Sequence, residues 1–208
     1  MTMLFSSRTS RLLMSAVVAL LPAAALAAPK VGEPAPAFTG VDAHGKTVTL
    51  SGLAGKTVVL EWMNDGCPYV VKWYKSGEMQ KLQRDATTKG AVWLTVASSA
   101  PGEQGHVDGE TALKQTADRN ASPTHFVLDP KGVIGRAYGA QVTPHMYVIA
   151  PDGKLAYMGG IDSIASTDPA DIPKAEPLAR LAINQVLDGK PVTKPVTRAY
   201  GCSVKYAN

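Results

Sequence analysis

The stretch VVLEWMNDGCPYVVKWYK, residues 58–75, decides the fold class. Its first part, Val58–Trp62, is a continuous apolar run broken by one acid, which is typical of a central buried strand. After a short turn, Pro68 is well placed to open a helix, because a first-turn residue has no intrahelical use for its N–H group. Cys67 therefore lies between a buried strand and the first turn of a helix. Apolar residues at helical spacing predict that the helix buries one face, made of Val71, Tyr74, Met79 and Leu82.

Strand and helix signals alternate through the rest of the chain. We expect two more strands, two hairpins and two more helices: strands at 92–97 and 124–128, hairpins at 38–50 and 146–158, and helices at 111–120 and 178–187. This order predicts one α/β domain, with a mixed central sheet flanked by helices and an N-terminal hairpin. The domain is expected to span residues 28–189, followed by a Pro-rich C-terminal tail at 190–208.

The N-terminus has the layout of a secretory signal peptide. Arg8 and Arg11 precede an uncharged stretch, and small residues at Ala25-Leu26-Ala27 offer a cleavage site. We therefore expect residues 1–27 to be removed and the mature protein to be periplasmic or secreted, with no stable membrane insertion. The alternative is a retained transmembrane anchor.

Composition narrows the class of protein further. The chain has 208 residues, of which 45% are hydrophobic, so it can bury a sizeable core. Removing residues 1–27 takes away two Arg and no acid, so 21 basic side chains become 19, against 17 acidic ones. These charges are scattered, which gives no case for a nucleic-acid partner. Two cysteines are too few for a disulfide-dense scaffold or an all-cysteine zinc site.

Cys67 is a candidate nucleophile on position alone. The free N–H groups of a helix N-terminus favour a thiolate, and the thiolate is the reactive form of cysteine. The positive charges of Lys72 and Lys75 could stabilise the thiolate a little further, although exposed charges have a weaker effect. A small hydrophobe at a helix start, or half of a structural disulfide, would look the same in sequence.

Several segments together resemble a known family. Residues 31–50 (VGEPAPAFTGVDAHGKTVTL), the strand 58–62 and Cys67-Pro68 are similar to the opening of thioredoxin-like redoxins, a group that includes the alkyl hydroperoxide reductase/thiol-specific antioxidant (AhpC/TSA) family. Val142-Thr143-Pro144, followed by 146–149, resembles the cis-proline loop and the next strand of that fold. The resemblance covers about 31–160. It implies a thioredoxin-like fold in which Thr143 and Pro144 face Cys67 and present backbone to a substrate.

The chain departs from that family at informative places. Val70 stands where thioredoxins carry the second Cys of Cys-x-x-Cys, so a local dithiol is excluded. Leu60 and Asn64 replace the Pro and the Thr or Ser that precede a peroxidatic Cys in peroxiredoxins. Glu61, in contrast, falls where many thioredoxins keep a buried acid. It could relay a proton to or from the sulfur, or pair with a lysine such as Lys56.

Cys202 is the only other cysteine of the chain, and it lies in a tail expected to be flexible. One nucleophilic Cys in the fold and one on a tail is the arrangement of a nucleophile with a resolving thiol. The resemblance thus implies an exported thiol-dependent oxidoreductase with antioxidant character and a redox-active Cys67–Cys202 disulfide. Its partners would be a peroxide or disulfide substrate and an external thiol reductant, with no cofactor or metal.

Other interpretations of the pair stay open. The bond could be a static staple, or the cysteines could pair between chains. The chain could also be a non-catalytic binding or copper-delivery module that uses Cys67, Cys202 and His145. The acidic residues of the loop 160–176, among them Asp162, are expected to be solvated.

Overall fold

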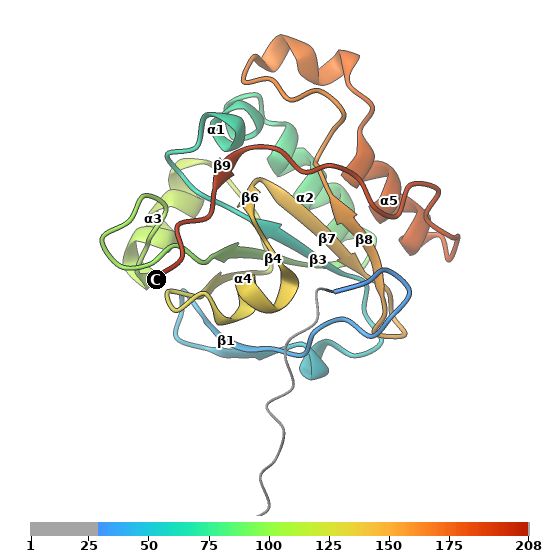
Figure 1. The fold of residues 1–208 in the computed structure, drawn as a ribbon, viewed down its shortest axis with the longest axis horizontal. Coiled ribbons are helices and arrows are strands. Elements are labelled where there is room, and N and C mark those ends of the chain that lie inside the picture. Colours follow the sequence, from blue (N-terminus) through green and yellow to red (C-terminus); the bar gives the residue numbers. More distant parts are fainter. Residues whose placement is uncertain (1–28, 208) are drawn as a thin grey trace, which may run out of the picture.

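The computed structural model describes residues 29–207, so the expected signal peptide at 1–27 lies outside the described residues. A seven-stranded mixed sheet forms its centre (Figure 1). Its strand order is β2-β1-β5-β4-β3-β7-β8. The strands are β1 (Thr39–Asp42), β2 (Thr47–Thr49), β3 (Val58–Trp62), β4 (Val92–Ala97), β5 (His125–Leu128), β7 (His145–Ile149) and β8 (Leu155–Gly159).

β3 lies inside the sheet, parallel to β4 and antiparallel to β7, and all five of its residues are buried. Successive side chains of β3 alternate between the two faces of the sheet, so Val59 and Leu60 enter different hydrophobic clusters. The predicted mixed α/β sheet is confirmed, and its apolar central strand is the one that leads to Cys67.

Helices cover both faces of the sheet. Buried residues of α1, α2, α3 and α5 pack on the face that includes Val59 and Cys67, whereas those of α4 pack on the face that includes Leu60 and Trp62. The helices are α1 (Pro68–Lys75), α2 (Glu78–Thr88), α3 (Gly109–Asp118), α4 (Val133–Tyr138) and α5 (Leu178–Leu187), with short 3₁₀ turns η1 (Ser51–Leu53) and η2 (Pro169–Lys174). None of the helices in residues 29–207 is long and apolar enough to span a membrane.

The structure corrects two details of the predicted helices. The stretch that starts at Pro68 is two helices, because Gly77 adopts a φ of +78° and ends α1 before α2 begins. Of the residues expected on its buried face, Val71 is only half-buried. The short α4 was not predicted.

The C-terminal segment is ordered, so the expectation of a flexible tail without structure is wrong. From the end of α5 the chain turns back and crosses to the other side of the domain (Figure 1). Its residues Cys202–Ser203 form β9, which pairs with β6 (Val142–Thr143). Hydrogen bonds from Met158 N to Pro195 O (3.0 Å) and from Ala100 N to Lys205 O (2.7 Å) attach it on either side of β9. We call residues 190–207 the strap.

Candidate active site

Cys67 is held at the start of α1. It is the N-cap residue, and its carbonyl accepts hydrogen bonds from the N–H groups of Val70 (3.0 Å) and Val71 (2.9 Å). Pro68 occupies the first helical position, as the sequence predicts. The side chain of Cys67 has no exposed surface in this structure. The thiol therefore sits at a helix N-terminus within the core, where a thiolate gains from the helix dipole.

The thiol contacts the cis-proline loop. Its Sγ donates to the carbonyl oxygen of Thr143 at 3.1 Å, and the peptide bond from Thr143 to Pro144 is cis. The close approach that the resemblance implied between Cys67 and this loop is present in the structure.

Cys202 reaches the same place from the strap. In the antiparallel pair of β6 and β9, Cys202 lies directly opposite Thr143, and the Thr143 hydroxyl donates to the Cys202 carbonyl at 3.4 Å. The structure thus brings Cys67, Thr143 and Cys202 together, although more than a hundred residues separate the two cysteines in the sequence. Both cysteines are free thiols here.

The two thiols differ in acidity. Burial disfavours the Cys67 thiolate, but the nearby Cys202 thiol, the polar side chain of Thr143 and the neighbouring backbone N–H groups outweigh burial and lower the pKa of Cys67. Burial and the neighbouring Cys67 sulfur raise the pKa of Cys202 to about 12. Of the two thiols, Cys67 is therefore the more acidic. A difference of this sign is what a nucleophile and a resolving thiol require.

Glu61 is fully buried on β3, on the same face of the sheet as Cys67. Its carboxylate accepts four hydrogen bonds: from Tyr74 Oη (2.8 Å), Trp93 Nε1 (2.9 Å), Thr95 Oγ1 (3.1 Å) and Gln83 Nε2 (3.2 Å). Burial raises the pKa of Glu61, and the four donors oppose part of that shift. Lys56 is exposed, so the lysine pairing left open by the sequence is not formed. Among the described residues, no hydrogen bond joins Glu61 to either sulfur.

His145 does not join the two cysteines. Its Nδ1 lies 3.2 Å from the Tyr147 hydroxyl, and burial lowers the pKa of His145 to about 4. Within residues 29–207, no three His, Cys, Asp or Glu side chains gather as a metal site would require. The copper ligand set of Cys67, Cys202 and His145 is not assembled.

Sequence reasoning missed a buried ion pair beside the site. Lys72 of α1 lies 3.6 Å from Asp162 Oδ2, and both side chains are almost completely buried, with 0% and 1% of their surface exposed. Tyr200 of the strap donates its hydroxyl to Asp162 Oδ1. The sequence had indicated an exposed lysine and a solvated aspartate. No local pattern corrects this, because these side chains come from three separate segments.

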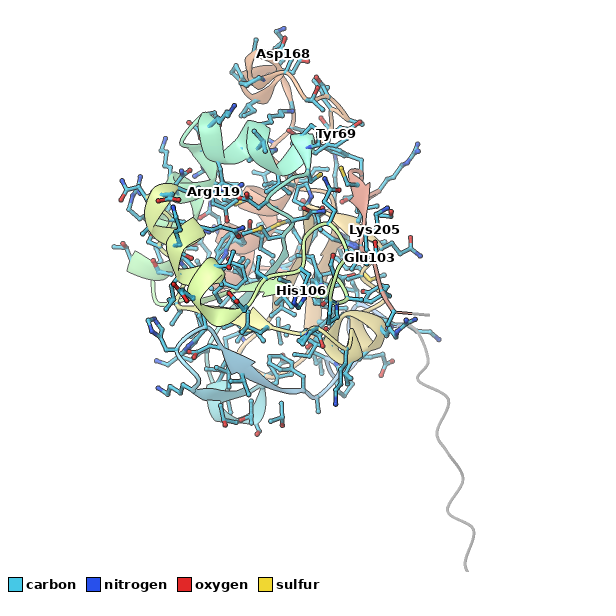
Figure 2. The ribbon with its side chains drawn as sticks, turned by 90° about the vertical axis from the view of Figure 1, so that its left-hand side faces the viewer. Tyr69, Glu103, His106, Arg119, Asp168 and Lys205 are labelled. Carbon is cyan, nitrogen blue, oxygen red and sulfur yellow. The ribbon has the colours of Figure 1, made fainter. Side chains whose placement is uncertain are left out.

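The surroundings of the site come from three segments. Figure 2 shows Tyr69 at the start of α1, Glu103 and His106 in the loop between β4 and α3, and Lys205 of the strap on one side of the molecule. The loop contacts the segment before Cys67, since Gln104 Nε2 donates to Gly66 O at 3.4 Å.

This fold and this site define a thioredoxin-like redoxin. A family model, described as "AhpC/TSA family", matches residues 31–158, and the chain belongs to that family. The match covers the sheet from β1 to most of β8 together with Cys67 and the cis-proline loop.

Solved structures show the same fold over most of the chain. A hypothetical protein of Sinorhizobium meliloti is 21% identical with a TM-score of 0.72, covering 87% of this chain and 97% of that one. An uncharacterized conserved protein of Geobacillus kaustophilus is 25% identical with a TM-score of 0.75, covering 86% and 93%. A protein described as a thiol:disulfide interchange protein, from Chlorobium tepidum, is 25% identical with a TM-score of 0.50, covering 63% and 85%. No curated protein sequence matches the chain.

Proposed function

We propose that this protein is an exported thiol-dependent oxidoreductase in which Cys67 is the nucleophile and Cys202 the resolving thiol. The observation that carries the proposal is the pairing of β6 with β9, which sets Cys202 beside a Cys67 of lowered pKa. The redoxin fold and the likeness to a thiol:disulfide interchange protein support the same class of reaction. Export, to the periplasm or the outside, rests on the signal pattern of residues 1–27.

The reaction runs in two steps. The Cys67 thiolate attacks one oxygen of a hydroperoxide, the O–O bond breaks, and Cys67 becomes a sulfenic acid while an alcohol or water leaves. With a disulfide substrate, the S–S bond breaks instead, Cys67 forms a mixed disulfide and one substrate thiolate leaves. The Cys202 thiol then attacks the Cys67 sulfur, forms the Cys67–Cys202 bond and releases water or the second substrate thiol. An external dithiol returns both cysteines to the thiol form.

The buried position of Cys67 favours a small substrate. Its sulfur has no exposed surface, and the backbone edge of Thr143, beside the cis-proline, is already paired with Cys202 of the strap. An extended polypeptide that used this edge would have to displace β9 first. A hydroperoxide or a low-molecular-weight disulfide needs less room, which fits an antioxidant role.

Glu61 enters the proposal as a proton relay. A buried carboxyl of raised pKa can hold a proton that the reaction later needs, and Glu61 lies on the same sheet face as Cys67. Because its oxygens are bonded to residues other than the cysteines, a proton must pass through an intervening group to reach the sulfur.

Steady-state turnover tests the proposal. The mature protein is given hydrogen peroxide, oxidised glutathione or the interchain disulfides of insulin, with dithiothreitol as reductant. We expect turnover with the two small oxidants, none in Cys67→Ser, and a single oxidation without efficient turnover in Cys202→Ser. Turnover by Cys67→Ser would overturn the role of Cys67. Cys202→Ser turning over like the wild type would overturn the role of Cys202, and a preference for insulin would overturn the small-substrate argument.

A further inference from the structure

The strap is tied down next to Cys202 by a buried charged group. Tyr200, two residues before Cys202, donates its hydroxyl to Asp162 Oδ1. The same oxygen accepts from Ile164 N at 3.0 Å. The other oxygen of Asp162 has no hydrogen-bond donor among the described residues, and its nearest charged neighbour is Lys72 Nζ at 3.6 Å. Lys72 in turn donates to Ser166 O at 3.0 Å.

We propose that Lys72, Asp162 and Tyr200 are positioning residues for the resolving step, holding Cys202 against Cys67. We call these three residues the positioning network. The proposal rests on the function proposed above, since it assigns these residues a part in the attack of Cys202 on the oxidised Cys67 sulfur.

The network connects the two cysteines through the protein. Lys72 belongs to α1, the helix that Cys67 caps. Tyr200 lies two residues before Cys202, the first residue of β9. The rings of Tyr69 and Tyr200 also pack edge to face, with centroids 5.5 Å apart. The helix of the nucleophile and the segment of the resolving thiol are thus fixed to each other by one ion pair, one charged hydrogen bond and one aromatic contact.

Burial makes this connection geometrically demanding. A charge that has left water must keep its partner, because an unpaired buried charge is strongly unfavourable. Lys72 and Asp162 are both buried, so displacement of Tyr200 from Asp162 removes a charge-assisted hydrogen bond that water is badly placed to replace. Replacing a buried ion pair by apolar groups is often neutral for stability, so such a network is better explained by the conformation that it specifies.

That conformation matters for the resolving reaction. The step forms the Cys67–Cys202 bond and breaks the S–O bond of the sulfenic acid, with water leaving, and its rate depends on how often the two sulfurs are aligned. On the far side of Cys202 the strap has a second anchor, since Tyr206 Oη donates to Ala140 O at 2.6 Å. Without Tyr200 on Asp162, the nearest remaining hydrogen bond of the strap before Cys202 is at Thr197, whose N–H donates to Met158 O at 3.1 Å, so the residues next to Cys202 are held less firmly on that side.

Tyr200→Phe tests the proposal, because it removes only the hydroxyl and keeps the ring on Tyr69. Its matched control is Tyr138→Phe, which removes a buried hydroxyl that donates to Pro36 O at 2.8 Å and makes no hydrogen bond to the strap. After one equivalent of hydrogen peroxide, dimedone trapping and mass spectrometry follow the Cys67 sulfenic acid and its conversion to the disulfide. We expect conversion about tenfold slower in Tyr200→Phe, as the loss of one hydrogen bond to a charged group predicts. The rate of sulfenic-acid formation should stay within about twofold of wild type in both variants, because this step does not use Cys202. A change of about twofold is smaller than the loss of one hydrogen bond would cause.

A second readout separates positioning from general loosening of the fold. A longer-lived sulfenic acid is oxidised further, so Tyr200→Phe should accumulate more Cys67 sulfinic acid than Tyr138→Phe under excess peroxide. Lys72→Met should slow the same step, and the double variant Lys72→Met/Tyr200→Phe should be no slower than the slower single variant, because residues of one network are not additive. Additive effects would remove Lys72 from the network.

The outcomes distinguish this proposal from the function on which it rests. If oxidised wild-type protein forms no Cys67–Cys202 bond, the proposed function fails. If the wild type forms the bond and Tyr200→Phe forms it at the same rate, the function stands and the positioning network is overturned.

Discussion

Gly201 of the strap lies so close to β6 that no side chain fits there. Its φ is +144°, a conformation that favours glycine, and a Cβ built there would lie 1.9 Å from Thr143 O and 2.7 Å from Thr143 C. Real Cβ atoms essentially never approach closer than 3.0 Å. Both obstacles are backbone atoms of β6, so no side chain can turn away to make room.

Gly201→Ala must therefore move the strap away from β6 by about 1 Å or more, and Cys202 moves with it. A misplacement of this size costs on the order of 100-fold in a reaction that depends on alignment. We expect the Cys67–Cys202 disulfide to form about 100-fold more slowly than in wild type. The free energy of unfolding should fall by only about 1–3 kcal/mol, because the strap is one edge of the molecule and the sheet is untouched.

The assay is oxidation by one equivalent of hydrogen peroxide, quenched with acid and followed by mass spectrometry of the disulfide-linked peptides. Gly189→Ala is the matched control, since Gly189 also has a positive φ (+67°) but a Cβ there meets nothing within 4 Å. In the control, the free energy of unfolding should fall by about 1 kcal/mol, because alanine is strained at a positive φ. Its rate of disulfide formation should equal that of the wild type. Disulfide formation in Gly201→Ala at the rate of Gly189→Ala would refute the argument that β9 positions Cys202.

Two further predictions follow from the acidities of the site. Cys202→Ala removes the neighbouring thiol and should raise the pKa of Cys67. The pH midpoint of Cys67 oxidation by hydrogen peroxide should therefore be higher than in the wild type. An unchanged or lower midpoint would contradict the assigned effect of the Cys202 thiol on Cys67. Burial raises the pKa of Glu61 above its unfolded value, so the folded state binds the carboxyl proton more tightly than the unfolded state does. The protonated carboxyl therefore contributes to stability below about pH 4.3, and this contribution is lost as pH rises through the folded pKa. The free energy of unfolding by urea should therefore fall for wild type relative to Glu61→Gln as pH rises above that value, whereas a parallel or rising difference would show that Glu61 is not destabilised by burial.

The parts of the fold that the sequence predicted are those with strong local signals. The strands at 58–62 and 92–97 and the helix at 178–187 have the predicted bounds, because long apolar runs and helical spacing depend on nearby residues alone. α4 has six residues between Gly132 and Gly139, both at positive φ, so locally it looks like a turn.

The candidate site was predictable where the family resemblance carried it. The cis bond before Pro144, its contact with Cys67 and the burial of Glu61 were all expected from motifs that lie on the domain itself. The path of the strap could not be read from sequence, because it depends on partners such as Thr143 for Cys202, far away in the chain. For the same reason Lys72 was expected in solvent: its counter-ion comes from the loop after β8.

The central claim is that Cys67 and Cys202 form a working redox couple, and the most direct test is the reduction potential of that pair. The mature protein is equilibrated with glutathione buffers of graded potential, quenched, and its disulfide mapped by mass spectrometry. We predict a Cys67–Cys202 bond within one chain, half-reduced near about −200 mV. A bond that stays oxidised below about −300 mV would mark a structural staple, and no bond between these two cysteines at any potential would contradict the paired mechanism.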